Sequence, residues 1–170
     1  ILVDKEEIGS MGNTGAQSAF MMMTIAEVIE KLTGSCSVTT LNKVIKNSAC
    51  MSSDVSAAVD PNYLSVSEEK NSSYAGYGVA IMKYTGARGK YDSYEIGKIM
   101  DNNGVIWQTG ELGKVDQGGG GTIAQYVANL NMNVIDCGVP VHSMHAPFEV
   151  VAKSDVYMAY RAYKAFYKDR

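Results

Sequence analysis

Short apolar runs alternate along this chain with segments long enough to form helices, and this alternation constrains the fold more than any other feature. Apolar runs bounded by turn residues are typical of buried strands. Strands that alternate with helices predict an α/β domain with a largely parallel or mixed sheet. Strands are expected near residues 1–8, 49–54, 77–84, 105–109 and 133–138, and helices over 17–32, 40–45, 93–100, 122–130 and about 150–168.

Length and charge exclude several classes of function. The 170 residues suit one domain, and 46% hydrophobic residues allow a sizeable core. A net charge of -3 argues against nucleic acid as a partner, because phosphate binding needs clustered Lys and Arg. No apolar run approaches the roughly 20 residues of a membrane span. We therefore expect neither a nucleic acid nor a membrane as the partner.

The cysteines indicate the compartment. Cys36, Cys50 and Cys137 are odd in number and scattered, without a Cys-x-x-Cys spacing. This pattern suits free thiols in a reducing compartment, so we expect a cytoplasmic protein. The chain does not begin with Met and opens inside a strand-like run, which indicates a piece of a longer protein.

The strand-like opening leads directly into two adjacent acids, Glu6 and Glu7, followed by Gly9. Carboxylates at the rim of a sheet are well placed for chemistry, and one can bind a metal ion while its neighbour moves a proton. A Glu-Glu pair is, however, most often a solvated surface feature. Partners elsewhere in the chain have to decide between the two interpretations.

Two such partners follow later strands. Asp54 ends the apolar run at 49–54, and His142 and His145 lie in a loop between two prolines. A loop histidine alone is seldom a ligand, but the set Glu6, Glu7, Asp54 and His145 would project from one edge of the sheet. Mixed carboxylate and imidazole ligands suit zinc, manganese or cobalt.

Two further patterns stay open. The four-glycine run at 118–121 opens a helix and lacks the lysine of a nucleotide-binding loop. It would serve either an anion at the helix start or close helix-sheet packing. Tyrosines recur at helical spacing in the last helix, where core packing is the first interpretation and an interface the second: Tyr157, Tyr160, Tyr163 and Tyr167.

Four separated segments resemble a known family in order and approximate spacing: residues 4–10 (DKEEIGS), 53–63 (SDVSAAVDPNY), 120–123 (GGTI) and 143–145 (SMH). They resemble the co-catalytic zinc metallo-aminopeptidases typified by aspartyl aminopeptidase and vacuolar aminopeptidase I, and the bacterial branch most closely. The resemblance covers essentially the whole chain.

The resemblance implies a role for each matching residue. Glu6 resembles the general base that activates water, and Glu7 resembles a ligand of one metal ion. Asp54 resembles a ligand of the other ion, and His145 a ligand paired with Glu7. The implied cofactors are two divalent ions, zinc first, with cobalt or manganese as alternatives.

The same resemblance implies a fold, a substrate and an assembly. The fold would be a three-layer α/β domain of the zinc-peptidase type, with a mixed sheet between helices. The activity would be that of an aminopeptidase, which removes N-terminal residues from peptides. Relatives of this kind form homo-oligomers, characteristically tetrahedral dodecamers.

The family pattern also contains elements that this sequence lacks. Members carry a His-x-Asp segment and a metal-bridging Asp upstream of the Glu-Glu pair, and an inserted dimerisation domain. We therefore expect residues 1–170 to be the C-terminal portion of a catalytic domain. The alternative is a catalytically silent fragment that acts only as a folding or assembly unit.

Overall fold

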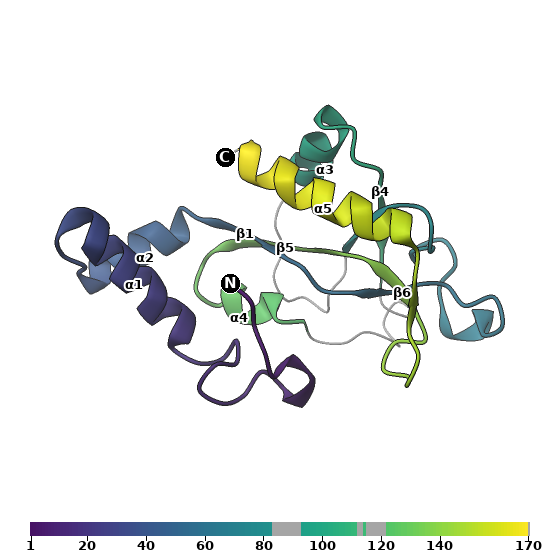
Figure 1. The fold of residues 1–170 in the computed structure, drawn as a ribbon, viewed down its shortest axis with the longest axis horizontal. Coiled ribbons are helices and arrows are strands. Elements are labelled where there is room, and N and C mark those ends of the chain that lie inside the picture. The colour runs from purple at the N-terminus through teal and green to yellow at the C-terminus, as the bar shows by residue number, and fades with distance from the viewer. Residues whose placement is uncertain (83–92, 112–113, 115–121, 170) are drawn as a thin grey trace.

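The computed structural model describes residues 1–82, 93–111, 114 and 122–169, and it has three layers (Figure 1). A mixed sheet forms the middle layer, with strand order β1-β5-β3-β4. Strand β1 (Ala49–Ser52) pairs parallel with β5 (Asn133–Gly138), which pairs antiparallel with β3 (Val79–Met82). Strand β4 (Trp107–Gly110) is parallel to β3 and lies at the edge. The expected α/β class with a mixed sheet is confirmed.

A second, smaller sheet continues the first beyond β1 and β5. Strand β2 (Ser56–Ala57) pairs parallel with β6 (Pro140–His142), and β6 pairs antiparallel with β7 (Val150–Val151). The two parallel pairs, β1 with β5 and β2 with β6, thus follow one another along the same two stretches of chain. The junction between them lies at residues 53–55, where Asp54 is found.

Helices cover both faces of the main sheet (Figure 1). Helices α3 (Ser93–Asn102) and α5 (Lys153–Lys168) pack together on one face, and the short α4 (Ala124–Ala128) covers β5 on the other. Because both faces are covered, β3 is buried at all four positions. The main core is built from Val79, Ile81, Ile96, Ile99, Met100, Val105, Ile135, Cys137, Ala159, Ala162, Ala165 and Phe166.

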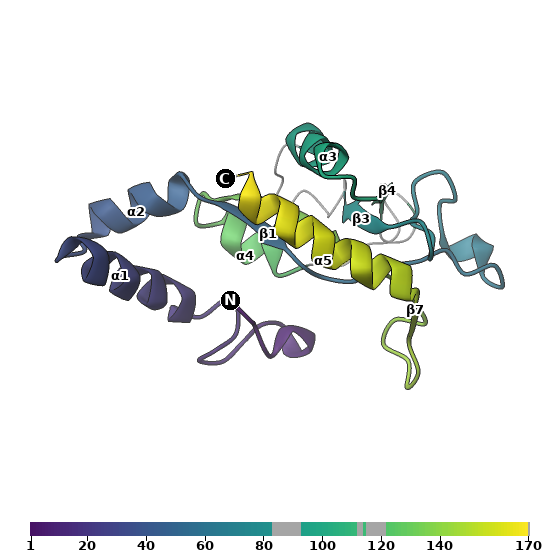
Figure 2. The same cartoon turned by 45° about the horizontal axis from the view of Figure 1, so that its top comes forward.

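Two helices lie beside the sheet rather than on it (Figure 2). Helix α1 (Phe20–Thr33) is followed by Gly34, whose φ of 84° ends the helix. Helix α2 (Val38–Lys46) is preceded by its N-cap Ser37, whose hydroxyl accepts a hydrogen bond from the backbone amide of Thr40 at 3.1 Å. Both ends use residues suited to these positions. Helix α1 leaves several large apolar side chains exposed: Phe20, Met23, Val28 and Leu32.

Most expected elements are present, with ends displaced by a few residues. The expectation for residues 1–8 is wrong: residues 1–5 form no strand, and Glu6–Ile8 is a single 3-10 turn. Apolar composition alone does not make a strand, because a strand needs a paired neighbour, and Leu2 is 100% exposed. The sequence also gave no sign of the two-residue strands β2 and β7 or of the turn η2 (Leu64–Val66). Within the described ranges, no helix is long and apolar enough to span a bilayer.

A buried carboxylate joins α5 to the chain before β3. Asp155, in the first turn of α5, is 0% exposed and accepts hydrogen bonds from the backbone amides of Gly76 at 2.7 Å and Gly78 at 2.9 Å. Gly78 has φ 90°, and an added Cβ would lie 2.2 Å from the carbonyl oxygen of Ile106. The Asp155 carboxylate therefore fixes Gly78 at a close approach to the backbone of Ile106 that only a glycine allows.

Replacing Asp155 by Ala is expected to lower the free energy of unfolding by about 2–4 kcal/mol, because two backbone amides lose their acceptor. Urea denaturation of the Asp155→Ala variant measures this loss. The matched control is Lys153→Ala, which changes an exposed residue of the same helix turn. Equal stability of the two variants would contradict the role given to Asp155.

Candidate active site

The loop that carries Glu6 has an unusual backbone. The 3-10 turn Glu6–Ile8 lies between Lys5, with φ 61°, and Gly9, with φ 83°. The turn is closed by the amide of Ser10, which donates to the carbonyl of Lys5 at 2.8 Å. Lys5 is not a glycine, so its left-handed conformation costs free energy that the surrounding contacts have to offset.

Side chains next to the turn hold this conformation. The hydroxyl of Thr14 donates to Asp4 at 2.6 Å, and the ammonium of Lys5 contacts both Asp4 and Thr14. The hydrogen bond from Thr14, with help from Lys5, lowers the pKa of the Asp4 carboxyl. Gly15 lies so close to the turn that an added Cβ would be 2.1 Å from the carbonyl oxygen of Ser10.

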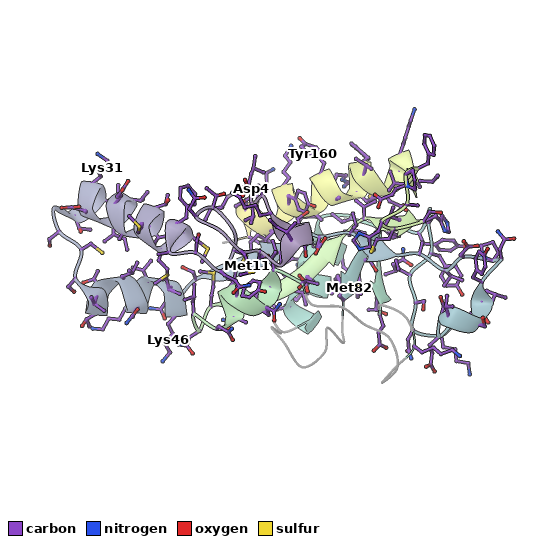
Figure 3. All side chains as sticks on the ribbon, turned by 90° about the horizontal axis from the view of Figure 1, so that it is seen from below. Asp4, Met11, Lys31, Lys46, Met82 and Tyr160 are labelled. Atoms are coloured by element: carbon purple, nitrogen blue, oxygen red, sulfur yellow. The ribbon has the colours of Figure 1, made fainter. Side chains whose placement is uncertain are left out.

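Gln17 attaches the same loop to the rest of the domain. Its side-chain amide donates to the carbonyl of Gly9 at 2.6 Å and to the hydroxyl of Tyr126 at 3.0 Å. Tyr126 belongs to α4, and Figure 3, with Asp4 and Met11 labelled, shows the loop beside that helix. Glu6 is thus presented from the α4 side of the sheet.

Asp54 lies at the junction between β1 and β2. Its carboxylate accepts the amide of Val55 at 2.8 Å, and an added Cβ on Gly138 would lie 1.3 Å from the Asp54 carbonyl oxygen. The backbone segments at Asp54 and at residue 138 can approach this closely only because residue 138 is a glycine. The preceding residue, Ser53, shares a short hydrogen bond with the hydroxyl of Tyr163 on α5.

His145 lies in the turn between β6 and β7. It has φ 66°, and Ser143 has φ 58°, so the turn contains two left-handed residues that are not glycine. The backbone amide of His145 donates to the Glu149 carboxylate at 2.6 Å, and the amide of Ala146 closes the turn on Ser143 at 2.9 Å. The imidazole is exposed, as a ligand at a site edge would be.

Left-handed backbone therefore gathers at the predicted site residues. The described non-glycine residues with positive φ are Lys5, Ser10, Asn131, Ser143 and His145. All but Asn131 lie in the two loops that carry Glu6 and His145. Such conformations persist where the surroundings fix them and concentrate at functional sites. This observation is independent of the residue types from which the site was predicted.

Asp136 is a buried acid, close enough to Asp54 to sense its charge, that the sequence analysis did not single out. It lies on β5, is only 2% exposed, and accepts a 2.6 Å hydrogen bond from the hydroxyl of Thr122, which follows the glycine run. Burial raises the pKa of its carboxyl, the Thr122 hydrogen bond opposes this change, and the charge of Asp54 adds to it. A charged residue inside an apolar strand was the available signal.

Two buried oxygens in this region, Asp136 Oδ1 and Ser52 Oγ, have no hydrogen bond of good geometry among the described residues, although the Ser52 hydroxyl lies close enough to the Asp136 carboxyl to lower its pKa. Ser52 and Asp136 are register partners on β1 and β5, and Asp54 follows two residues after Ser52. Polar atoms without partners are expensive to bury. The carboxyl ends of β1 and β5 therefore form a polar interior next to Asp54.

The thiols of the same region are unreactive. Burial raises the pKa of Cys137 to about 12, and it also raises the pKa of Cys50. A thiol that stays protonated at neutral pH is a poor nucleophile. Cys50 and Cys137 are therefore poor candidates for a nucleophile, which leaves the carboxylates and the imidazole as candidate groups.

The described side chains do not by themselves form a metal site. Among them, no group of three or more His, Cys, Asp or Glu residues lies in position to hold an ion, and the side chain of Glu7 is not among those described. Asp54 and His145 have the donor chemistry that zinc prefers. They fit as members of a ligand set that needs further carboxylates or imidazoles. The glycine run at 118–121 lies outside the described residues.

Comparisons with known proteins agree on one family. The family described as aminopeptidase I zinc metalloprotease (M18) matches residues 1–167. A probable M18 family aminopeptidase 1 of Clostridium acetobutylicum is 50% identical over 98% of this chain and 37% of its own length. The crystal structure of an M18 family aminopeptidase from Thermotoga maritima has a TM-score of 0.88 at 44% identity, over 96% of this chain and 38% of that one.

A more distant likeness shows the fold alone. The mApe1 dodecamer of S. cerevisiae has a TM-score of 0.77 at 22% identity, over 98% of this chain and 37% of that one. The chain spans little more than a third of the length of the relatives that it matches.

Replacing Asp136 by Asn should flatten the pH dependence of stability. In the folded protein the Asp136 carboxyl keeps its proton at pH values above its ordinary pKa of 3.8, whereas in the unfolded chain it loses it. The free energy of unfolding of the wild type therefore falls as the pH rises from the unfolded-state pKa to the raised folded-state pKa. The variant has no such titration. Urea denaturation between about pH 4 and pH 7 measures both profiles. Parallel profiles would contradict this assignment, and the exposed Asp169→Asn is the control.

Proposed function

The chain belongs to the aminopeptidase I zinc metalloprotease family (M18), and on this basis we propose that the full-length protein removes N-terminal residues from peptides. Membership of this family supports the proposed class of activity, that of an aminopeptidase. The left-handed loops around Glu6 and His145 support the choice of residues, because they single out the same two places without reference to the family. The proposed substrates are peptides with a free N-terminus.

In this proposal the ligands Glu7, Asp54 and His145 hold zinc together with residues beyond this chain. Two ions are proposed, with cobalt or manganese as alternatives to zinc. When bound, such a pair supplies Lewis-acid polarisation of the scissile carbonyl and a lowered pKa for water. The carboxylate of Glu6 accepts the proton of the attacking water and passes it to the leaving amine. The contacts of Lys5 with Thr14 and of Gln17 with the Gly9 carbonyl fix the loop that carries Glu6.

We also propose that residues 1–170 are the C-terminal portion of a larger catalytic domain. The supporting observation is the exposure of apolar side chains in the first third of the chain, including Ile1, Leu2, Leu32 and Val38. Large apolar side chains that are exposed together are typical of surfaces that contact another segment or protein. An upstream segment of the same protein, with its own metal ligands, would provide it. By analogy with mApe1, the assembled protein is a homo-oligomer, and a dodecamer is proposed.

Changing Glu6 to Gln tests the proposed base. The amide keeps the size of the side chain but cannot accept the proton, so kcat should fall by about 10²–10⁴-fold. Zinc content, measured by elemental analysis of the full-length variant, should stay unchanged. The control is Glu27→Gln, on the exposed side of α1, which should keep full activity. Wild-type turnover by Glu6→Gln would exclude Glu6 as the base.

A second candidate is a catalytically silent assembly unit. It is favoured by the lack of a three-ligand group among the described side chains. Elemental analysis of the isolated 170-residue chain after equilibration with zinc tests whether this chain supplies a complete metal site by itself. We expect fewer than two tightly bound ions per chain, because the bridging carboxylate lies elsewhere. Two tightly bound ions would mean that this chain supplies a complete site, contrary to the partial-domain proposal.

A further inference from the structure

A surface groove of about 210 Å³ lies between the end of α3 and the outer side of α5. It is lined by Asn103, Tyr157, Tyr160, Arg161, Lys164 and Lys168, with Ala165 between them. Figure 3 labels Tyr160, which lies on α5 on the sheet face opposite α4 and the Glu6 loop. The groove is therefore separate from the candidate active site, and nothing argued below depends on peptidase activity.

The groove is positively charged. Three cationic side chains line it, and none of its described lining residues has a carboxylate. Two acids lie nearby: Asp169 accepts the side-chain amide of Asn103 at 3.4 Å, and Asp101 accepts the indole of Trp107 at 2.8 Å. Asp101 is engaged outside the groove, whereas Asp169 contacts the lining residue Asn103 and offsets part of the positive charge. A local excess of positive charge remains, although the chain as a whole carries a net charge of -3.

Part of the groove is held in shape. Arg161 is half-buried and donates to the carbonyl of Asn103 at 2.7 Å, which joins α5 to the end of α3. Only one of its five N–H groups is needed for this bond, so the guanidinium keeps donors for a ligand. Lys164 and Lys168 are exposed.

Two tyrosine rings form the other part. Tyr157 and Tyr160 are 57% and 56% exposed, and their rings stack with centroids 6.3 Å apart. Lys164 Nζ lies 6.0 Å from the centre of the Tyr160 ring. Rigid exposed tyrosines beside cations are typical of surfaces that bind another chain. Core packing, the first interpretation of this tyrosine stripe, is wrong for both residues.

The spacing of the cations discriminates between ligands. Arg161, Lys164 and Lys168 follow one another at three and four residues, so they are distributed over about 10 Å of helix in steps of roughly 4.5–6 Å. A single phosphate needs donors that converge on one point. In an extended peptide, alternate side chains on one side are about 6.6–6.8 Å apart, which is close to the longer step.

We propose that this groove binds a short acidic peptide segment in an extended conformation. Alternate carboxylates of the peptide pair with Arg161, Lys164 and Lys168, and the peptide backbone lies against Tyr157 and Tyr160. The partner is thus a protein with an exposed acidic tail or loop, and charge complementarity selects it. The interaction is of the salt-sensitive kind, because exposed ion pairs are screened.

Fluorescence anisotropy with the full-length protein tests this proposal. The probe is an N-acetylated, fluorescein-labelled peptide with glutamates at alternate positions, since the acetyl group blocks an aminopeptidase. The double variant Lys164→Ala/Lys168→Ala should weaken binding about fivefold or more. The charge-matched control Lys98→Ala/Lys153→Ala removes two exposed lysines outside the groove and should change Kd less than twofold.

Tyr160→Ala should also weaken binding, whereas Tyr167→Ala, an exposed tyrosine of the same helix outside the groove lining, should not. Several outcomes would overturn the proposal: no binding of the probe, equal losses in the lysine pair and its control, or equal affinity for a peptide with Gln in place of Glu. Displacement by inorganic phosphate at concentrations near the peptide Kd would also overturn it, because the site would then be a phosphate site.

Discussion

The parallel pairing of β1 with β5, and its continuation as β2 with β6, positions Asp54, Asp136 and the turn that carries His145. At the junction the carbonyl of Asp54 lies against Gly138 so closely that no side chain could fit between them. Asp54 therefore leaves the sheet at a fixed place. Asp136 holds Thr122 from the same strand pair, and β6 leads directly into the turn that carries His145.

The N-terminal loop that carries Glu6 is held by a different kind of interaction. No strand holds Glu6; a 3-10 turn does, between left-handed residues and fixed by the contacts of Asp4, Lys5, Thr14 and Gln17. Strained backbone of this kind is stable only where several interactions agree. The loop is joined to α4 through Gln17 and Tyr126, so its position depends on the layer that covers β5.

Helix α5 has an inner side that packs against the core and an outer side that is exposed, and the two sides have different roles. Its inner side contributes Ala159, Ala162 and Phe166 to the core, while Asp155 fixes the chain before β3 and Tyr163 contacts the residue next to Asp54. Its outer side carries the aromatic and basic groove. A helix packed on a sheet separates such roles by its 3.6-residue period, so the outer residues can serve a partner without disturbing the core.

The sequence by itself determined the α/β class, most helices and strands, and the family, because these follow from local periodicity and from short motifs in a fixed order. It also indicated Glu6, Glu7, Asp54 and His145 as residues of interest, since all four were expected after strand-like runs at one edge of the sheet.

Only the tertiary structure decided which apolar runs become strands, because a strand exists only through its neighbour. Residues 1–5 have none in the described chain, and β2 and β7 are two-residue strands that exist only by pairing with β6. The buried Asp136 and the exposure of Tyr157 and Tyr160 were likewise decided by packing: β5 is covered on both faces, whereas α5 is covered on one. Burial is a property of the assembled layers, and no local pattern of residues contains it.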